Sequence, residues 1–165
     1  MNEKSIHTKD RIIYFAGAIR GDRVAAAEIR DMIIFIRLMG LSVLTEHIIE
    51  ADTVTAHAKV MGKDRASVTA EDIERQDMAW LDQATHVIAE ISGSSTGTGR
   101  EIEYARNKEH FGKVPAKVLC LYKKERESIA SPMVRGMSPE KYPNVKVVSY
   151  DSMSAAKEII KEFLG

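Results

Sequence analysis

Residues 86–105 read HVIAEISGSSTGTGREIEYA, and the other elements of the chain are best understood relative to them. The first six residues are short, rich in β-branched side chains and followed by turn-forming residues, as in a buried strand of a parallel sheet. Glycines, serines and threonines follow as a loop, and 100–105 then has the composition of a helix. Such a strand, loop and helix bring backbone N–H groups and the positive end of the helix dipole together. The stretch therefore predicts a site for an anion such as phosphate.

Glu101 places a negative charge beside this predicted anion site. One interpretation is a capping box over 98–101, in which the carboxylate binds a backbone N–H. The other is a nucleophile that the helix dipole keeps ionised next to a substrate. Spacing alone does not separate the two, and the second interpretation needs another carboxylate at the same site.

Composition limits the class of protein. A chain of 165 residues predicts one domain over 1–165, with a core that needs no disulfide. Within it, residues 1–10 are expected to form a polar, flexible N-terminal arm. Lys plus Arg and Asp plus Glu number 24 each, so the formal net charge is zero. This balance argues against nucleic-acid binding, which favours a basic excess. A small anionic ligand needs only a local cluster of donors.

The single cysteine, Cys120, lies in an apolar run and is interpreted as a core thiol in a reducing compartment. No apolar run approaches the ~18–20 residues that span a bilayer, and the first residues lack the apolar region of a signal peptide. We therefore expect a cytoplasmic protein that does not contact membranes. No metal-ligand spacing is present, and we expect neither a metal nor a cofactor.

A second strand, glycine turn and helix begin at the N-terminal end of the predicted domain. Residues 11–16 form an apolar run, 17–23 hold two glycines and two arginines, and 24–39 have apolar residues at helical spacing. Gly40 follows as a stop signal. Neither glycine turn contains G-x-G-x-x-G, so classical dinucleotide binding is not supported.

Further strands are predicted over 41–44, 116–122 and 145–150. A weak helix is predicted over 53–60. Further helices are predicted from Thr69 to about Gln83 and after residue 152. The alternation favours an α/β fold of three layers, flavodoxin-like or Rossmann-like, with a five-stranded parallel sheet in the order 2-1-3-4-5. In that order the two glycine turns open on the same crevice.

Asp77 falls on the inward face of the predicted helix that Ile73, Trp80 and Leu81 define. An inward aspartate is costly unless it is paired, hydrogen-bonded or faces a polar cleft. Asp77 is either a buried helix cap or the partner of an arginine, or it is the second carboxylate that Glu101 requires. His47, just past the strand over 41–44, is either a crevice residue or an ordinary loop residue.

The crevice would combine two kinds of group. Backbone amides, a serine hydroxyl and a guanidinium make a phosphate site, and two carboxylates with a tyrosine make a set for acid, base or nucleophilic chemistry. A phosphorylated sugar with a cleavable bond at its anomeric carbon would use both.

Six short motifs carry a resemblance that covers nearly the whole domain. They are IYFAGAIRG at 13–21, LTEH at 44–47, QDxxWL at 76–81, VIAE at 87–90, SxGxGxE at 95–101 and SxMxRG at 131–136. Each is weak singly, but the ordered set is specific. It resembles the 2'-deoxynucleoside 5'-phosphate N-hydrolases, relatives of the nucleoside 2-deoxyribosyltransferases.

The resemblance implies hydrolysis of the N-glycosidic bond of a deoxynucleoside monophosphate. By position, Glu101 would attack C1', Asp77 would assist departure of the base, and Tyr14 would orient nucleophile and sugar. His47 would lie beside the base. The other implied substrate and phosphate contacts are Gly17, Ala18, Ile19, Arg20, Gly21, Arg23, Ser95, Gly97 and Gly99. Ser131 and Met133 would reach the site of the other subunit in a homodimer.

Some features depart from the family pattern. Arg100 occupies a position that is aromatic in the animal enzymes, and the 52–68 segment is unlike theirs, which leaves the base preference open. Three alternatives remain: a deoxyribosyltransferase, a ribonucleotide pyrimidine N-glycosidase, and a nucleotide-sensing binding module without turnover. The predicted phosphate site argues against the first, and two retained carboxylates argue against the last.

Overall fold

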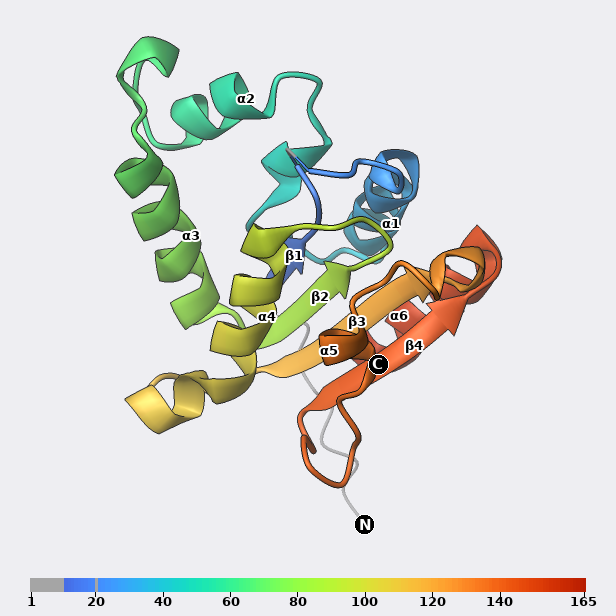
Figure 1. Cartoon of the computed structure of the whole chain (residues 1–165). Helices are drawn as coiled ribbons and strands as arrows, with labels where there is room; N and C mark the ends of the chain where they lie inside the picture. The colour runs from blue at the N-terminus through green and yellow to red at the C-terminus, as the bar shows by residue number, and fades with distance from the viewer. Residues whose placement is uncertain (1–10, 20) are drawn as a thin grey trace.

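The computed structural model describes residues 11–19 and 21–165. The predicted arm at 1–10 and Arg20 therefore lie outside the described residues. Four parallel strands form one sheet in the order β1-β2-β3-β4 (Figure 1). The strands are β1 (Ile13–Ala16), β2 (His86–Glu90), β3 (Lys117–Lys123) and β4 (Val145–Tyr150).

Helices cover both faces of this sheet, as predicted. The helices α1 (Ala26–Leu38) and α6 (Met153–Leu164) pack on one face, and α3 (Ala70–Gln83) and α4 (Thr96–Asn107) pack on the other. Alternate strand residues point into the two cores, so that Phe15 packs with α1 whereas Tyr14 and Ala16 pack with α3 and α4. The three-layer α/β prediction is confirmed.

Shorter helices fill the connections. They are α2 (Thr53–Val60), which was predicted with these bounds, α5 (Pro132–Arg135) and the 3₁₀ helices η2 (Glu46–Ile49), η3 (Arg65–Ser67), η4 (Lys108–Phe111) and η5 (Lys124–Arg126). Cys120 is buried and unpaired in β3, as expected for a core thiol. No helix in the described part of the chain has both the length and the apolar character needed to cross a bilayer.

The prediction of five strands in the order 2-1-3-4-5 is not confirmed. The segment at 41–44 pairs with β1 only through the bridge between Ile13 and Val43, where the Leu44 N–H donates to the Ile13 carbonyl at 2.8 Å. The side chain of Thr45 then takes the place of a further strand residue. Its Oγ1 accepts from the Phe15 N–H at 2.9 Å and donates to the Phe15 carbonyl at 2.7 Å. A hydroxyl thus satisfies the edge of β1 where backbone pairing stops.

Candidate active site

A cavity of about 490 Å³ lies at the carboxyl ends of β1 and β2. The loops that follow these strands form part of its wall, and η2, α2, α3 and α4 form the rest. The lining residues are Gly17, Ile19, Gly21, His47, Thr53, Val54, His57, Ile73, Asp77, Ser94, Ser95, Thr96, Gly97, Thr98 and Glu101. Adjacent parallel strands β1 and β2 bring the two glycine turns together, which is the position where open α/β sheets bind ligands.

Two carboxylates from different helices share this cavity. Asp77 comes from α3 and Glu101 from α4, and both line the same wall. The hydroxyl of Tyr14, a β1 residue with 2% of its surface exposed, donates to Oε1 of Glu101 at 2.6 Å. The site therefore holds a hydrogen-bonded carboxylate beside a second carboxylate that points into the same space.

Burial decides how these groups titrate. It raises the pKa of Asp77 to about 7, helped by the negative charges of Glu101 and Glu74. Burial also raises the pKa of Glu101, against the opposing effects of the Tyr14 hydrogen bond and the Arg100 charge. The pKa of Tyr14 is raised by burial and by both carboxylates, so its hydroxyl stays protonated. Because Glu101 accepts a hydrogen bond from Tyr14, whereas Asp77 has no donor among residues 11–19 and 21–165, the pair favours a proton on Asp77 and a charge on Glu101.

The capping-box interpretation of Glu101 is wrong. The helix α4 begins three residues earlier than that box requires, because Ser95 is its N-cap and accepts from the Thr98 N–H at 3.2 Å. Glu101 therefore lies in the second turn, with its carboxylate against Tyr14 instead of a backbone N–H. Thr69 provides the capping box of α3 with Asp72, at the residue where the helix was predicted to begin.

The two glycine turns touch each other through their backbones. A Cβ on Gly93 would lie 1.9 Å from the Asp22 carbonyl oxygen, and one on Gly21 would lie 2.4 Å from the Ser94 carbonyl oxygen. The Asp22 N–H donates to the same Ser94 oxygen at 3.3 Å. Only glycine permits this contact, so these positions are fixed by the close approach of the loops.

Side chains behind the loops hold them in place. Arg126 donates to the Asp22 carboxylate at 2.6 Å and to the Ser92 carbonyl at 3.3 Å. The buried carboxylate of Glu90 accepts from the Ser92 N–H at 3.1 Å and from the Tyr150 hydroxyl at 2.9 Å. The loop that begins α4 is consequently supported before any ligand arrives.

Two polar atoms in the cavity wall lack partners. Among the described residues, neither Oγ1 of Thr98 nor Nδ1 of His47 has a hydrogen-bond partner, although both atoms are buried. Buried polar groups are normally hydrogen-bonded, so an unpaired one calls for an explanation such as a functional role. Both atoms are therefore candidates for contact with a bound molecule.

The structure brings most of the predicted site residues together. Tyr14 lies directly behind Glu101, and the cavity is lined by the predicted residues Gly17, Ile19, Gly21, His47, Asp77, Ser95, Gly97 and Glu101. Others lie outside it. Ala18 and Arg23 line a small neighbouring cavity, Gly99 and Ser131 line a third one of about 290 Å³ beside the α4 loop, and Met133 is 85% exposed. Arg20 belongs to the residues that are not described.

Several lining residues were not predicted. They are Thr53, Val54, His57, Ile73, Ser94, Thr96 and Thr98. Ile73 was placed in the core by its helical spacing, and the hydroxyls of the loop were visible but unassigned. The sequence contains no signal that places α2 over the cavity, since that depends on how the 52–68 connection folds. Among residues 11–19 and 21–165, no cluster of three or more His, Cys, Asp and Glu side chains could hold a metal ion.

Fold and site together define an α/β protein in which two carboxylates share a cavity with a glycine- and hydroxyl-rich loop at a helix N-terminus. No family model matches the chain. The chain is 32% identical over 154 residues to "Putative 2'-deoxynucleoside 5'-phosphate N-hydrolase 1" of Thermofilum pendens, which covers 92% of this chain and 94% of that protein. It is 34% identical over 124 residues to the 5-hydroxymethyl-dUMP N-hydrolase of Homo sapiens, which covers 75% of this chain and 64% of the human protein. The chain belongs to the 2'-deoxynucleoside 5'-phosphate N-hydrolase family.

A solved structure supports the fold independently. The CMP N-glycosidase BcmB of Clostridium botulinum matches with a TM-score of 0.61 and 18% sequence identity. The match covers 93% of this chain and 99% of that one. The fold of this chain is thus shared with a solved N-glycosidase structure.

Proposed function

We propose that this protein hydrolyses the N-glycosidic bond of 2'-deoxynucleoside 5'-monophosphates to a free base and 2-deoxyribose 5-phosphate. The observation that carries the proposal is the hydrogen bond from Tyr14 to Glu101, in a cavity that also holds Asp77. Membership of a family whose members are named for this reaction supports it.

The carboxylate of Glu101 is the nucleophile. It attacks C1' of the sugar through an oxocarbenium-like state, forming a glycosyl ester as the C1'–N bond breaks. The Tyr14 hydroxyl keeps this carboxylate ionised and fixes its direction.

Asp77 is the acid and then the base. Its proton passes to the departing base, which otherwise leaves poorly as an anion. A water molecule then attacks C1', its proton goes to the Asp77 carboxylate, and Glu101 is released. The raised pKa of Asp77 suits both directions of transfer near neutral pH.

The 5'-phosphate binds at the α4 N-terminus. Ser95, Thr96 and Gly97 present the loop there, and the backbone of Gly21 packs against the same loop. N–H groups and the helix dipole favour a dianion at this place. Thr98 offers its unpartnered hydroxyl to the sugar or the phosphate. Arg20 remains predicted as a further phosphate ligand.

A binding module without turnover explains these features less well. A protein that only senses a phosphate gains nothing from two carboxylates beside the anion, since like charges repel. A tyrosine that donates to one of the carboxylates adds no affinity for phosphate either.

The decisive experiment incubates the protein with each deoxy- and ribonucleoside monophosphate and measures free base by chromatography. The reactions are run with and without a second base as acceptor. Release of base from deoxynucleotides alone supports the proposal. Sugar transfer to the acceptor would identify a transferase, release from CMP or UMP a ribonucleotide glycosidase, and binding without release a sensor.

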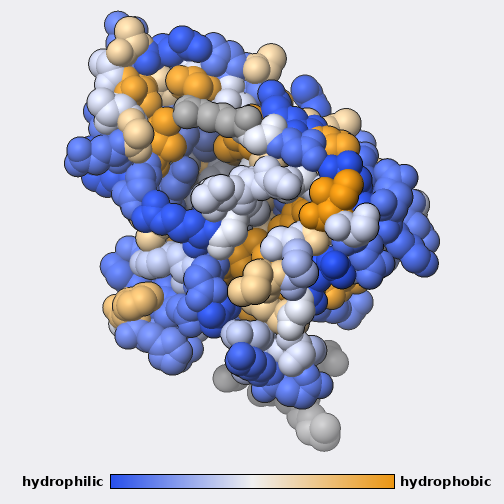
Figure 2. All heavy atoms as spheres, in the orientation of Figure 1, coloured by the Kyte–Doolittle hydropathy of each residue, from blue (hydrophilic) through white to orange (hydrophobic). Residues whose placement is uncertain are grey.

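We further propose a homodimer in which Ser131 and Met133 complete the neighbouring site. Met133 and Ile129 are exposed next to the cavity that Ser131 and the α4 loop share. Figure 2 shows apolar side chains over the α5 region between hydrophilic surfaces. Exposed apolar side chains that form a patch are typical of a protein–protein interface.

Mixing of inactive variants tests the shared site. Ser131→Glu places a negative charge against the partner's bound phosphate, and Glu101→Gln removes the nucleophile. In a mixed dimer one of the two sites holds both native residues, so activity should return on mixing and exchange. No recovery, or a monomer by sedimentation, would refute the shared site while leaving the reaction in place.

A further inference from the structure

The helix α2 places a second histidine in the cavity wall. The rings of His57 and His47 lie with centroids 4.6 Å apart and planes at 79°, an edge-to-face contact. Both side chains are more than nine-tenths buried, and both line the cavity that holds Asp77 and Glu101. The segment at 52–68 that carries His57 is also the segment for which the sequence predicts a departure from the family pattern.

Trp80 supports both imidazoles. Its ring centroid lies 5.4 Å from that of His47 and 5.6 Å from that of His57, and Trp80 itself does not line the cavity. Trp80 is on α3, three residues after Asp77, so the pair of imidazoles belongs to the same side of the cavity as the proposed acid. A base that takes its proton from Asp77 would therefore extend toward the two histidines.

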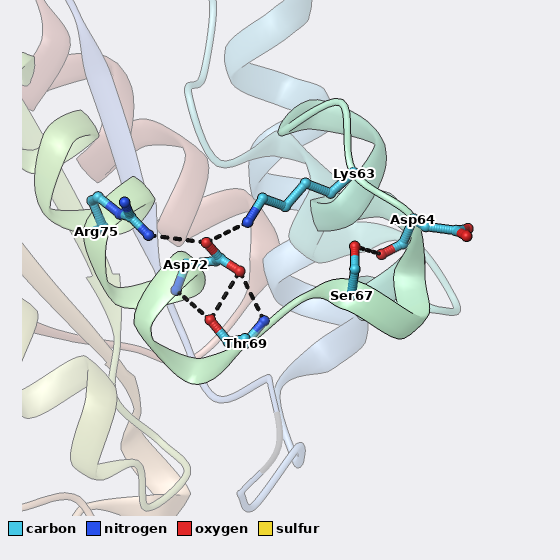
Figure 3. A network of polar contacts seen from close by, with 6 residues as sticks. All are labelled: Lys63, Asp64, Ser67, Thr69, Asp72 and Arg75. Carbon is cyan, nitrogen blue, oxygen red and sulfur yellow. Dashed lines mark hydrogen bonds and ion pairs between the residues drawn. The ribbon is translucent and has the colours of Figure 1, made fainter.

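Polar contacts on either side of α2 hold the segment that carries it. Asp72 accepts from Lys63 at 2.5 Å, from Arg75 at 3.0 Å and from the Thr69 N–H at 3.0 Å (Figure 3). At the other end, Asp52 caps α2 by accepting from the Thr55 N–H at 3.1 Å and pairs with Arg65 at 3.2 Å. His57 thus lies in a structured segment that Lys63 ties to α3 just after α2, while Asp52 at the start of α2 pairs with Arg65 of η3.

His47 is suited to hydrogen bonding as an uncharged ring. Burial, with a contribution from His57, lowers the pKa of His47 to about 4, so that its ring is uncharged at neutral pH. A neutral imidazole has one N–H donor and one bare nitrogen acceptor, and can bind either an amino or an oxo group. Within the described chain, the buried Nδ1 of His47 has no partner, and His47 itself lines the cavity.

Apolar residues complete this end of the cavity. Val54 and Ile73 lie in the wall with the two histidines. An apolar wall with a few placed polar groups is the usual pattern for recognising a flat heteroaromatic ligand. The phosphate loop, by contrast, supplies hydroxyls and backbone amides.

We propose that His57, acting with His47, hydrogen-bonds to the polar edge of the nucleobase and is a specificity-determining residue for the base. The proposal rests on the proposed function, because it takes the ligand to be a nucleotide. It assigns base choice in this chain to a residue of α2 outside all the motifs that define the resemblance.

The test measures kcat/KM of His57→Phe for a panel of deoxynucleoside monophosphates that differ in their oxo and amino groups. Phenylalanine keeps an aromatic ring against His47 and Trp80 but removes both ring nitrogens. The ratio of kcat/KM between the best and the worst substrate should fall by roughly tenfold or more, because hydrogen-bonding sites discriminate strongly. His57→Gln, which restores a donor and an acceptor, should retain part of the ratio and covers the case that His57→Phe does not fold.

The control is His110→Phe, the same change on an exposed residue of η4. It should leave all kcat/KM values unchanged. An equal loss on every nucleotide in His57→Phe, with the ratio intact, would show that His57 only packs and would overturn the proposal. If the wild type binds nucleotides without releasing base, the proposed function fails instead, and the same ratio taken from calorimetric Kd values then decides the role of His57.

Discussion

The hydroxyl of Tyr14 lies 2.6 Å from Oε1 of Glu101, although the two residues are 87 positions apart in the chain. The strand β1 supplies the donor and the helix α4 supplies the acceptor, so the contact exists only when the sheet and its covering helix are assembled. The hydrogen bond that orients the proposed nucleophile therefore forms only in the folded protein.

Replacement of Tyr14 by phenylalanine should slow base release by roughly 10- to 100-fold, since a hydrogen bond to a charged group contributes about 1.5–3 kcal/mol. The loss should appear in kcat, with KM little changed, because the hydroxyl acts on the nucleophile. Steady-state kinetics with a deoxynucleotide checks this. A change in KM alone would assign Tyr14 to substrate binding.

Glu101→Gln should abolish base release while nucleotide binding stays largely intact. The amide keeps the shape of the side chain and can still accept from Tyr14, but it cannot form the glycosyl ester. Calorimetry and a base-release assay on the same preparation separate the two properties. Normal turnover in this variant would contradict the assignment of the nucleophile.

Activity should fall as the pH rises through about 7, because Asp77 must carry a proton to protonate the departing base and its pKa lies there. In Asp77→Asn this limb of the pH profile should disappear, together with about 10²–10⁴ of the rate. A bell-shaped profile that survives in Asp77→Asn would assign the proton to another group.

The Asp77 carboxyl also makes the free energy of unfolding depend on pH. Since its native pKa is raised, the native state binds more protons than the unfolded state between the ordinary carboxyl pKa and about 7. Asp77 therefore lowers the free energy of unfolding as pH rises across that window. Thermal melts should show Asp77→Asn gaining stability relative to wild type as the pH increases.

Gly93→Ala should destabilise the protein by more than 1 kcal/mol, as expected when a new methyl group meets an immovable backbone oxygen, here only 1.9 Å away. Gly99→Ala offers a matched comparison inside α4, where a new Cβ meets nothing within 4 Å. It should raise the free energy of unfolding by roughly 0.5–1 kcal/mol through helix propensity. Chemical denaturation of both variants tests the pair, and equal effects would show that the loops separate easily.

Lys108→Met should also lower the free energy of unfolding, although lysine is usually found at the protein surface. This lysine is fully buried, and its Nζ donates to the carbonyls of Leu81, Asp82 and Ala84 at the end of α3. Loss of the ammonium leaves these carbonyls unsatisfied, at about 1–3 kcal/mol for such a group. Lys161→Met, on the exposed side of α6, should change stability by less than about 0.5 kcal/mol.

Local patterns in the sequence predicted much of the fold. The strand at 86–90, the helices over 26–38 and 70–83, and the inward position of Asp77 all follow from spacing of apolar residues within one element. These features depend on neighbours close in the chain. The adjacency of the two glycine turns followed from the handedness and order of parallel strands.

Other features could not be predicted because they depend on contacts between distant segments. Thr45 replaces a strand residue only because its hydroxyl reaches Phe15, and Ser95 competes successfully with Thr98 for the N-cap of α4. His57 reaches the cavity through the fold of the 52–68 segment, in which Lys63, just after α2, contacts Asp72 of α3. No periodicity in the sequence reports such an arrangement.

The hydroxyl of Thr45 has a bearing on how the protein behaves at high concentration. An open strand at the border of a sheet is a template on which other chains can add, and this is a common start of aggregation. At Phe15 both backbone groups of β1 are already occupied by Thr45, and Val43 bridges to Ile13 just before it. The border of the sheet nearest the cavity is therefore closed to strand addition without the need for a fifth strand.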